Sequence, residues 1–173
     1  MDVSLQTLHQ IPLTDGNATC DAKWRFRLQS NFASYFLAQE PRAESASLYV
    51  ATLNALDILL FPKNDFWEWK ARLLESEDPA VRQNLIRALR HSGGEAQLDR
   101  HGRFVLPVHV RESLRISAVG VDFKILSDMP VRLMTVDRYK EDKQLVELGD
   151  QLDARGASEY ARHLKSDRHQ GRS

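Results

Sequence analysis

The feature that most constrains this chain is a short segment that occurs twice. Asp21-Ala-Lys-Trp-Arg-Phe-Arg-Leu28 aligns without a gap to Asp99-Arg-His-Gly-Arg-Phe-Val-Leu106, and the aspartate, arginine, phenylalanine and leucine match in both. The sequence around each copy predicts two strands, a helix and two more strands. We therefore expect two copies of one unit of roughly 75 residues, with an additional helix inserted between them.

Each copy predicts a tight turn between its first two strands. Asp21 and Asp99 can accept hydrogen bonds from backbone amides further along the chain, which stabilises a turn. Gly102 permits a positive φ in the second copy. Trp24 occupies the matching position in the first copy, where a bulky residue should be strained. Two interpretations follow: either the first turn has a different shape, or it keeps the shape and its role has weakened.

Periodicity and punctuation residues place the other elements. Asp78-Pro79 begins a helix as N-cap and first helical residue, and Gly93-Gly94 ends it. A second helix precedes it over residues 65–75. The remaining predictions are a strand pair within 19–28, a helix over 30–37, strands over 47–52, 56–61, 95–98, 103–106, 121–126 and 131–136, and helices over 108–114 and 137–152.

Composition limits the possible classes of protein. The 173 residues carry 24 basic and 24 acidic side chains, with 42% hydrophobic and 28% charged residues, as in ordinary soluble domains. No apolar run is long enough to span a bilayer, and the first residues lack the features of a secretory signal. The single cysteine, Cys20, excludes an internal disulfide and fits a reducing cytoplasm.

Several segments together resemble a known family. The stretch Leu98-Asp-Arg-His-Gly-Arg-Phe-Val-Leu-Pro-Val-His-Val-Arg-Glu-Ser-Leu-Arg-Ile116 is similar to the second half of the bacterial MraZ proteins, which belong to the SpoVT-AbrB, or swapped-hairpin, group. Leu56-Asp-Ile-Leu-Leu-Phe-Pro62 and the helices after it resemble the middle of those proteins. The family carries an Asp-x-x-x-Arg motif in each half, and this chain has both. The resemblance covers about Gly16 to Gln151.

The resemblance implies a fold, a function and partners. The fold is α+β, with two pseudo-symmetric AbrB-like swapped-hairpin repeats that form a double-split β-barrel with peripheral helices. The function is sequence-specific binding of double-stranded DNA at promoter repeats, as a transcriptional regulator of the division and cell-wall gene cluster. The implied assembly is a homo-oligomeric ring in the cytoplasm, associated with the nucleoid. Neither enzymatic activity nor a cofactor is implied.

These expectations divide the chain into five parts. Residues 1–15 form an N-terminal arm, which is longer than the family pattern suggests. Residues 16–76 form the first repeat, 77–94 the linking helix, and 95–152 the second repeat with a C-terminal helix. Residues 153–173 form a polar tail that we expect to be flexible.

The arginines of the two motifs are the first candidates for DNA contact. An arginine held by a turn aspartate is preorganised, and its remaining donors can meet a phosphate or the O6 and N7 edge of guanine. Arg25 and Arg103 are therefore predicted to bind DNA, while Asp21 and Asp99, with Gly102, shape the turns. The alternative, that these ion pairs only stabilise the turns, is equally open, and both can hold at once.

The local charge supports a basic face. The segment from Arg82 to Arg115 contains seven arginines and three acidic residues, a net charge of +4 in a chain that is neutral overall. Within it, Arg100 lies beside the second motif, and Lys23 lies inside the first. We add both to the predicted DNA-binding residues. A solvated helical surface would give the same local count, so the charge supports the interpretation without deciding it.

Other chemistries have less support. No histidine or carboxylate spacing predicts a metal site, and Cys20 is expected to be a small packed residue. The paired carboxylates Asp21 and Asp99 each have an arginine four residues on, which favours the charged form and opposes general-acid catalysis. The neutral net charge and Trp24 leave one alternative function, a diverged ring-forming scaffold that no longer binds DNA.

Overall fold

A computed structural model describes residues 11–75, 78–128 and 130–148. The chain divides into two compact units, Met1–Val136 and Asp137–Ser173. In the second unit, residues 137–148 are helical, as predicted for the start of the C-terminal helix. The predicted end of that helix, the predicted tail over 153–173 and the first ten residues of the predicted arm lie outside the described residues.

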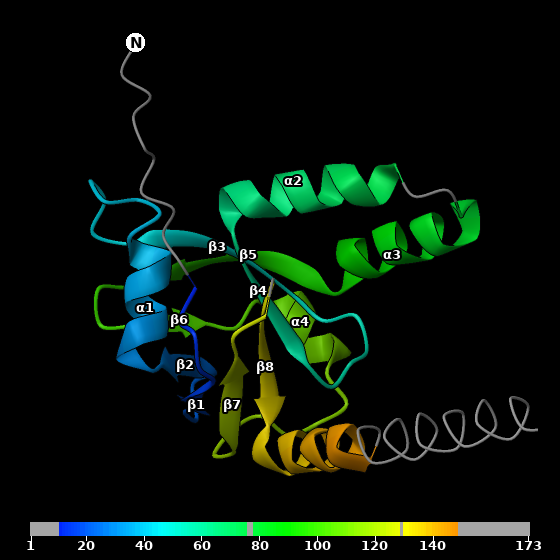
Figure 1. The fold of residues 1–173 in the computed structure, drawn as a ribbon. Helices are drawn as coiled ribbons and strands as arrows, with labels where there is room; N and C mark the ends of the chain where they lie inside the picture. The colour runs from blue at the N-terminus through cyan, green and yellow to red at the C-terminus, as the bar shows by residue number, and fades with distance from the viewer. Residues whose placement is uncertain (1–10, 76–77, 129, 149–173) are drawn as a thin grey trace, which may run out of the picture. The chain divides into compact units, whose positions relative to one another are not determined.

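The described part of the first unit combines eight strands and four helices, so the α+β class is confirmed (Figure 1). Its elements in chain order are β1 (Gly16–Cys20), β2 (Arg25–Leu28), α1 (Ser30–Leu37), β3 (Ala46–Ala51), β4 (Ile58–Pro62), α2 (Lys63–Leu74), α3 (Pro79–His91), β5 (Gly93–Leu98), β6 (Arg103–Val105), α4 (Val108–Ser113), β7 (Asp122–Leu126) and β8 (Val131–Thr135). Within the described ranges, no helix has the length and apolar character needed to cross a membrane.

All eight strands belong to one antiparallel sheet, in the order β5-β3-β4-β8-β7-β1-β2-β6. The two end strands, β5 and β6, are consecutive in the chain and meet at their connecting turn, where the Asp99 amide donates to the Arg103 carbonyl at 2.8 Å. The sheet is therefore a nearly closed barrel, and closure of this kind leaves little unpaired strand edge exposed.

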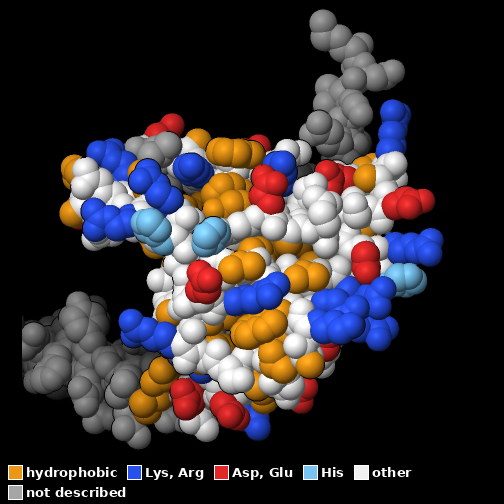
Figure 2. Space-filling model, turned by 180° about the vertical axis from the view of Figure 1, so that it is seen from behind, with side chains coloured by type: hydrophobic (Ala, Val, Ile, Leu, Met, Phe, Trp, Pro, Cys, Tyr) orange, Lys and Arg blue, Asp and Glu red, His pale blue; other side chains and the backbone are white. Residues whose placement is uncertain are grey.

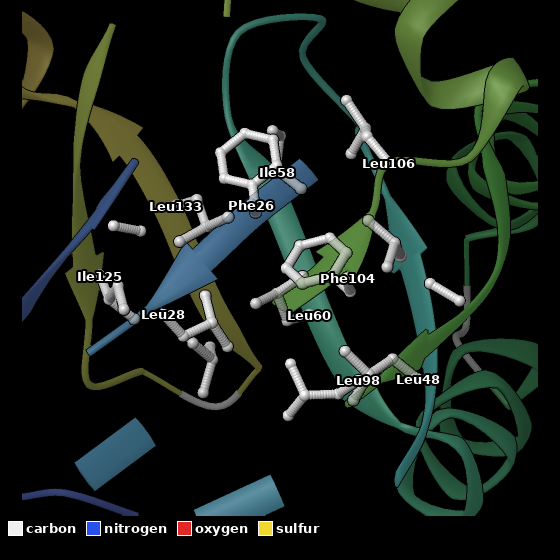
Figure 3. Packing of buried hydrophobic residues seen from close by; sticks show 14 of the residues in the cluster. Phe26, Leu28, Leu48, Ile58, Leu60, Leu98, Phe104, Leu106, Ile125 and Leu133 are labelled. Carbon is white, nitrogen blue, oxygen red and sulfur yellow. The ribbon is translucent and has the colours of Figure 1, made fainter. Parts of the chain in front are cut away.

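The barrel interior is filled by the alternate, inward-facing residues of its strands (Figure 3). Three phenylalanines lie at its centre: Phe26 stacks on Phe104 with ring centroids 5.4 Å apart, and Phe123 meets Phe26 edge-on at 5.1 Å. In β2 and β6, exposed and buried residues alternate strictly. The phenylalanine of each repeated motif is therefore a core residue, and the residues on either side of it, Arg25 and Arg27 in β2 and Arg103 and Val105 in β6, face outward.

Strand β4 is buried on both faces, which explains why its sequence is a continuous apolar run. Ile58 and Leu60 face the barrel interior, whereas Leu59 and Phe61 belong to a second cluster with Phe66 of α2 and with Leu89 of α3. Both of these helices lie outside the barrel on the same side (Figure 1).

Helix α3 begins as predicted. The Asp78 side chain accepts hydrogen bonds from the amides of Ala80 (2.9 Å) and Val81 (3.4 Å), and Pro79 is the first helical residue. The predicted end was wrong, because Gly93 and Gly94 begin strand β5 instead of capping the helix. A Cβ on Gly93 would lie 2.5 Å from the Tyr49 hydroxyl, and one on Gly94 would lie 2.8 Å from Pro107 Cβ. These glycines permit close packing of β5 against Tyr49 of β3 and against Pro107, which precedes α4.

Candidate nucleic-acid interface

The turn between β1 and β2 is built around one carboxylate. Asp21 Oδ1 accepts hydrogen bonds from the amides of Lys23 (2.8 Å) and Arg25 (3.1 Å), and Oδ2 accepts one from Arg25 Nε (2.8 Å). Two backbone bonds complete the turn: the Trp24 amide donates to the Asp21 carbonyl and the Asp21 amide donates to the Arg25 carbonyl, each at 3.0 Å. One aspartate therefore fixes both the backbone of the turn and the direction of the arginine.

The turn between β5 and β6 has the same hydrogen bonds at matching positions. Asp99 Oδ1 accepts from the amides of His101 (2.8 Å) and Arg103 (3.0 Å), and Oδ2 accepts from Arg103 Nε (3.0 Å). The Gly102 amide donates to the Asp99 carbonyl at 3.0 Å. Asp99 and Gly102 therefore form the second turn in the way that the repeated sequence predicted.

The structure brings the two turns together. Strands β2 and β6 pair antiparallel, with Phe26 opposite Phe104 at the centre of the pairing. Each strand is also bonded to the turn of the other hairpin. The Leu28 amide donates to the Gly102 carbonyl and the Leu106 amide donates to the Trp24 carbonyl, both at 2.9 Å. The two arginine-bearing turns therefore lie at opposite ends of one two-strand ribbon whose outer face is exposed.

Trp24 does not change the shape of its turn. It has a φ of 60°, close to the 76° of Gly102, so the prediction of a strained residue is confirmed and the alternative of a different turn shape is wrong. The surroundings differ instead: the Arg111 guanidinium lies over the Trp24 ring at 5.7 Å, while a Cβ on Gly102 would lie 2.9 Å from Ala33 Cβ. Ala33 and Arg111 are matching positions of α1 and α4, and each is suited in size to the residue that it faces.

The two aspartates are held in their charged form. The hydrogen bond from the Arg25 amide is the main cause that lowers the pKa of Asp21 below the ordinary value of 3.8. Partial burial alone would raise the pKa of Asp99, but the hydrogen bonds from Arg103 and the His101 amide, with the Arg103 charge, outweigh it and lower that pKa too. A carboxylate with a lowered pKa is a poor general acid near neutral pH, which argues against paired catalytic carboxylates.

The four predicted basic residues are all exposed. Arg25 and Arg103 each use Nε to bind their aspartate, and 44% of each arginine side chain remains exposed. Within the described part of the chain, their Nη groups make no hydrogen bond, so those donors are available to a ligand. Lys23 and Arg100 are turn residues at positions that do not match in the two copies, and Arg100 Nε donates to His101 Nε2 at 3.4 Å.

A fifth basic residue, Arg27, belongs to this surface but was not among the predicted DNA-binding residues. It lies on the exposed face of β2, directly opposite Arg103 of β6. The signal was present in the sequence, because Arg-Phe-Arg in a strand places both arginines on the face opposite the core phenylalanine. Figure 2 shows Lys and Arg side chains gathered beside a histidine on the side of the molecule where Figure 1 places β2 and β6.

The position of Cys20 can also be compared with its prediction. Cys20 is buried at the end of β1, and burial is the main cause that raises its pKa to about 11, so the thiol stays protonated and behaves as a packed residue. Within residues 11–75, 78–128 and 130–148, no group of three His, Cys, Asp or Glu side chains is arranged to hold a metal ion.

Comparisons with known proteins add no family to these observations. No protein-family profile matches the chain. No curated protein matches it either.

Proposed function

We propose that this chain is a DNA-binding transcriptional regulator of the MraZ type. The observation that carries the proposal is the placement of Arg25 and Arg103 on one exposed ribbon, each held at Nε by a turn aspartate with both Nη groups available. Guanidinium groups presented in this way suit phosphate oxygens and the major-groove edge of guanine. The resemblance of both motifs to the MraZ pattern points to the same ligand.

The proposed architecture is a duplicated swapped hairpin. Exchanging β1 with β5, β2 with β6, β3 with β7 and β4 with β8 converts the pairing β1–β7 into β5–β3 and β3–β4 into β7–β8. The same exchange leaves β2–β6 and β4–β8 unchanged. In this arrangement the first strand of each hairpin pairs with a strand from the other half of the chain, which supports the swapped-hairpin interpretation.

Local geometry supports the duplication as well. Gln29 precedes α1 with φ −56° and ψ 143°, and Pro107, 78 residues later, precedes α4 with φ −57° and ψ 144°. The ring of Pro107 restricts its φ, whereas Gln29 is held in the same conformation by hydrogen bonds. Gln29 Oε1 accepts from the Asn17 amide at 3.0 Å, and the Gln29 amide donates to the Asn17 carbonyl at 3.0 Å.

A homo-oligomeric ring is part of the proposal. The indole of Trp67 on α2 is 56% exposed, whereas Phe66 beside it is buried and Trp69 is partly buried. A large aromatic side chain on an exposed helix face is typical of a protein interface. A ring would present many weakly basic ribbons to one duplex, and tethered contacts raise the overall affinity by orders of magnitude without requiring a high net charge.

The proposal is tested with the DNA upstream of the protein's own gene cluster. Fluorescence anisotropy should show binding that weakens steeply as salt rises. Arg103→Ala and Arg25→Ala should each weaken binding to that DNA, whereas Arg72→Ala is a matched control, because Arg72 lies on α2 with a side chain that is 79% exposed. Arg103→Lys retains the charge but loses the planar fork, so we expect it to weaken binding less than Arg103→Ala does.

Folding and assembly are measured on the same samples. Circular dichroism and light scattering should show an unchanged fold and particle mass for Arg103→Ala. A native particle that binds no DNA at low salt would support the scaffold alternative over the regulator. Loss of the fold in Arg103→Ala would show that the arginine stabilises the turn, and Arg103→Lys would then be the test of DNA contact.

A further inference from the structure

The register of the β2–β6 ribbon places two arginines opposite each other at one end only. Arg27 faces Arg103 across the pair, whereas Arg25 at the other end faces Val105. All four side chains lie on the exposed face. The ribbon that carries the repeated motif therefore has a doubly charged end and a singly charged end.

The doubly charged end has little to neutralise it. Side chains directly opposite each other in an antiparallel pair have Cβ atoms about 4.5–5.5 Å apart, and like charges at such positions destabilise the sheet. Asp99 already occupies Nε of Arg103. Within the described ranges, Arg27 has no carboxylate within ion-pair distance.

Along the row of the sheet that contains Arg27, the adjacent strand brings no carboxylate beside it. The next residue across the sheet from Arg27 is Thr19 of β1, and Asp122 of β7 lies opposite Thr19. With neighbouring strands about 4.8 Å apart, Asp122 is roughly 10 Å from Arg27 along this row. Two adjacent guanidinium groups with free donors thus lie on a surface where the nearest unengaged carboxylate of the row is two strands away.

We propose that Arg27 and Arg103 together bind one phosphate of the DNA backbone, and that the matching end of the ribbon, at Arg25 and Val105, has no such site. This inference rests on the proposed DNA-binding function. Paired guanidinium groups suit a phosphate because each can direct two N–H donors at its oxygens. A phosphate contact fixes position without reading sequence, so the unequal ends would fix the direction in which each protomer lies on the duplex.

Two substitutions test the site in opposite directions. Arg27→Thr removes one member of the pair and keeps a side chain suited to a strand. Val105→Arg creates the same facing pair at the other end, opposite Arg25. Each phosphate contact contributes about 0.9 to the slope of log K against log salt concentration. We expect the magnitude of that slope, per bound protomer, to fall by up to about 0.9 in Arg27→Thr and to rise by up to about 0.9 in Val105→Arg, because each substitution removes or creates at most one phosphate site.

A second measurement needs no DNA. Thermal unfolding of the full chain is compared in sodium phosphate and in sodium chloride at equal ionic strength. The wild type should gain melting temperature in phosphate, Arg27→Thr should lose most of that gain, and Val105→Arg should increase it. In chloride at low ionic strength, Arg27→Thr should melt higher than the wild type, because the facing charges are gone.

The outcomes separate this inference from the proposed function. DNA binding with a wild-type salt slope in both variants would overturn the phosphate site and leave the regulator intact. No DNA binding, together with a phosphate-dependent gain that Arg27→Thr abolishes, would support the anion site and overturn its assignment to DNA. A melting temperature insensitive to phosphate in all three proteins, with unchanged slopes, would refute the site altogether.

Discussion

Replacing Trp24 by glycine or by alanine isolates the backbone strain of the first turn. Both variants lose the indole and its contact with Arg111, so they differ only in how well they accept a φ of 60°. A left-handed conformation costs an ordinary residue about 1–2 kcal/mol, whereas glycine adopts it freely. Glycine loses more backbone freedom on folding, which offsets about 0.5–1 kcal/mol of that gain. We therefore expect Trp24→Gly to be more stable than Trp24→Ala by about 1 kcal/mol.

Chemical denaturation followed by circular dichroism measures the difference. An unfolding free energy about 1 kcal/mol larger for the glycine variant corresponds to a melting temperature about 2–4 °C higher in a domain of this size. The sign is the decisive result, because glycine is less stable than alanine at most helix and strand positions by a similar amount. An alanine variant equal to or more stable than the glycine variant would refute the strained turn.

Three further predictions concern the second turn and the core beside the first. Gly102→Ala should lose about 2–4 kcal/mol of unfolding free energy, because it adds left-handed strain to the 2.9 Å approach of Ala33 Cβ, and denaturation measures the loss. The lowered pKa of Asp99 stabilises the fold above the ordinary value of 3.8, and this contribution is lost as the pH falls below that value through the lowered pKa of the folded state. Asp99→Asn should therefore show a weaker loss of stability on acidification in pH-dependent melting. With a pKa of about 11, Cys20 should react with a thiol reagent at neutral pH only after unfolding, and rapid labelling of the native protein would contradict its burial.

Much of the fold could be predicted because the informative residues act locally. Asp78-Pro79 marks the start of α3 through a side chain that bonds amides two and three residues away. The repeated motif predicts its own turn for the same reason, since Asp99 bonds only residues within four positions of itself. Alternation in Arg-Phe-Arg indicates which side chains enter the core. None of these inferences needs knowledge of distant parts of the chain.

The errors came from contacts between distant segments. A glycine pair such as Gly93-Gly94 is typical of a helix end, yet these two residues begin strand β5. Glycine is needed there because Tyr49 and Pro107 leave no room for a side chain. Val81 lies at helical spacing from the buried Leu89 of α3, so periodicity alone would bury both, yet Val81 is 47% exposed. The pairing of Arg27 with Arg103 depends on the register of two strands more than 70 residues apart, and no local pattern specifies such a register.

The aspartates at these turns raise the question of whether they help or hinder the binding of an anion. A phosphate held by Arg103 Nη would lie about 6–7 Å from the Asp99 carboxylate, and in water that repulsion is about 0.6 kcal/mol. Fixing the arginine in advance saves about 0.5–1.5 kcal/mol of side-chain entropy that binding would otherwise cost. The two effects are of similar size, so the aspartate leaves affinity nearly unchanged while it fixes the direction of the guanidinium. For a chain with no net charge, the arrangement of a few oriented arginines therefore matters more to recognition than the total number of basic residues.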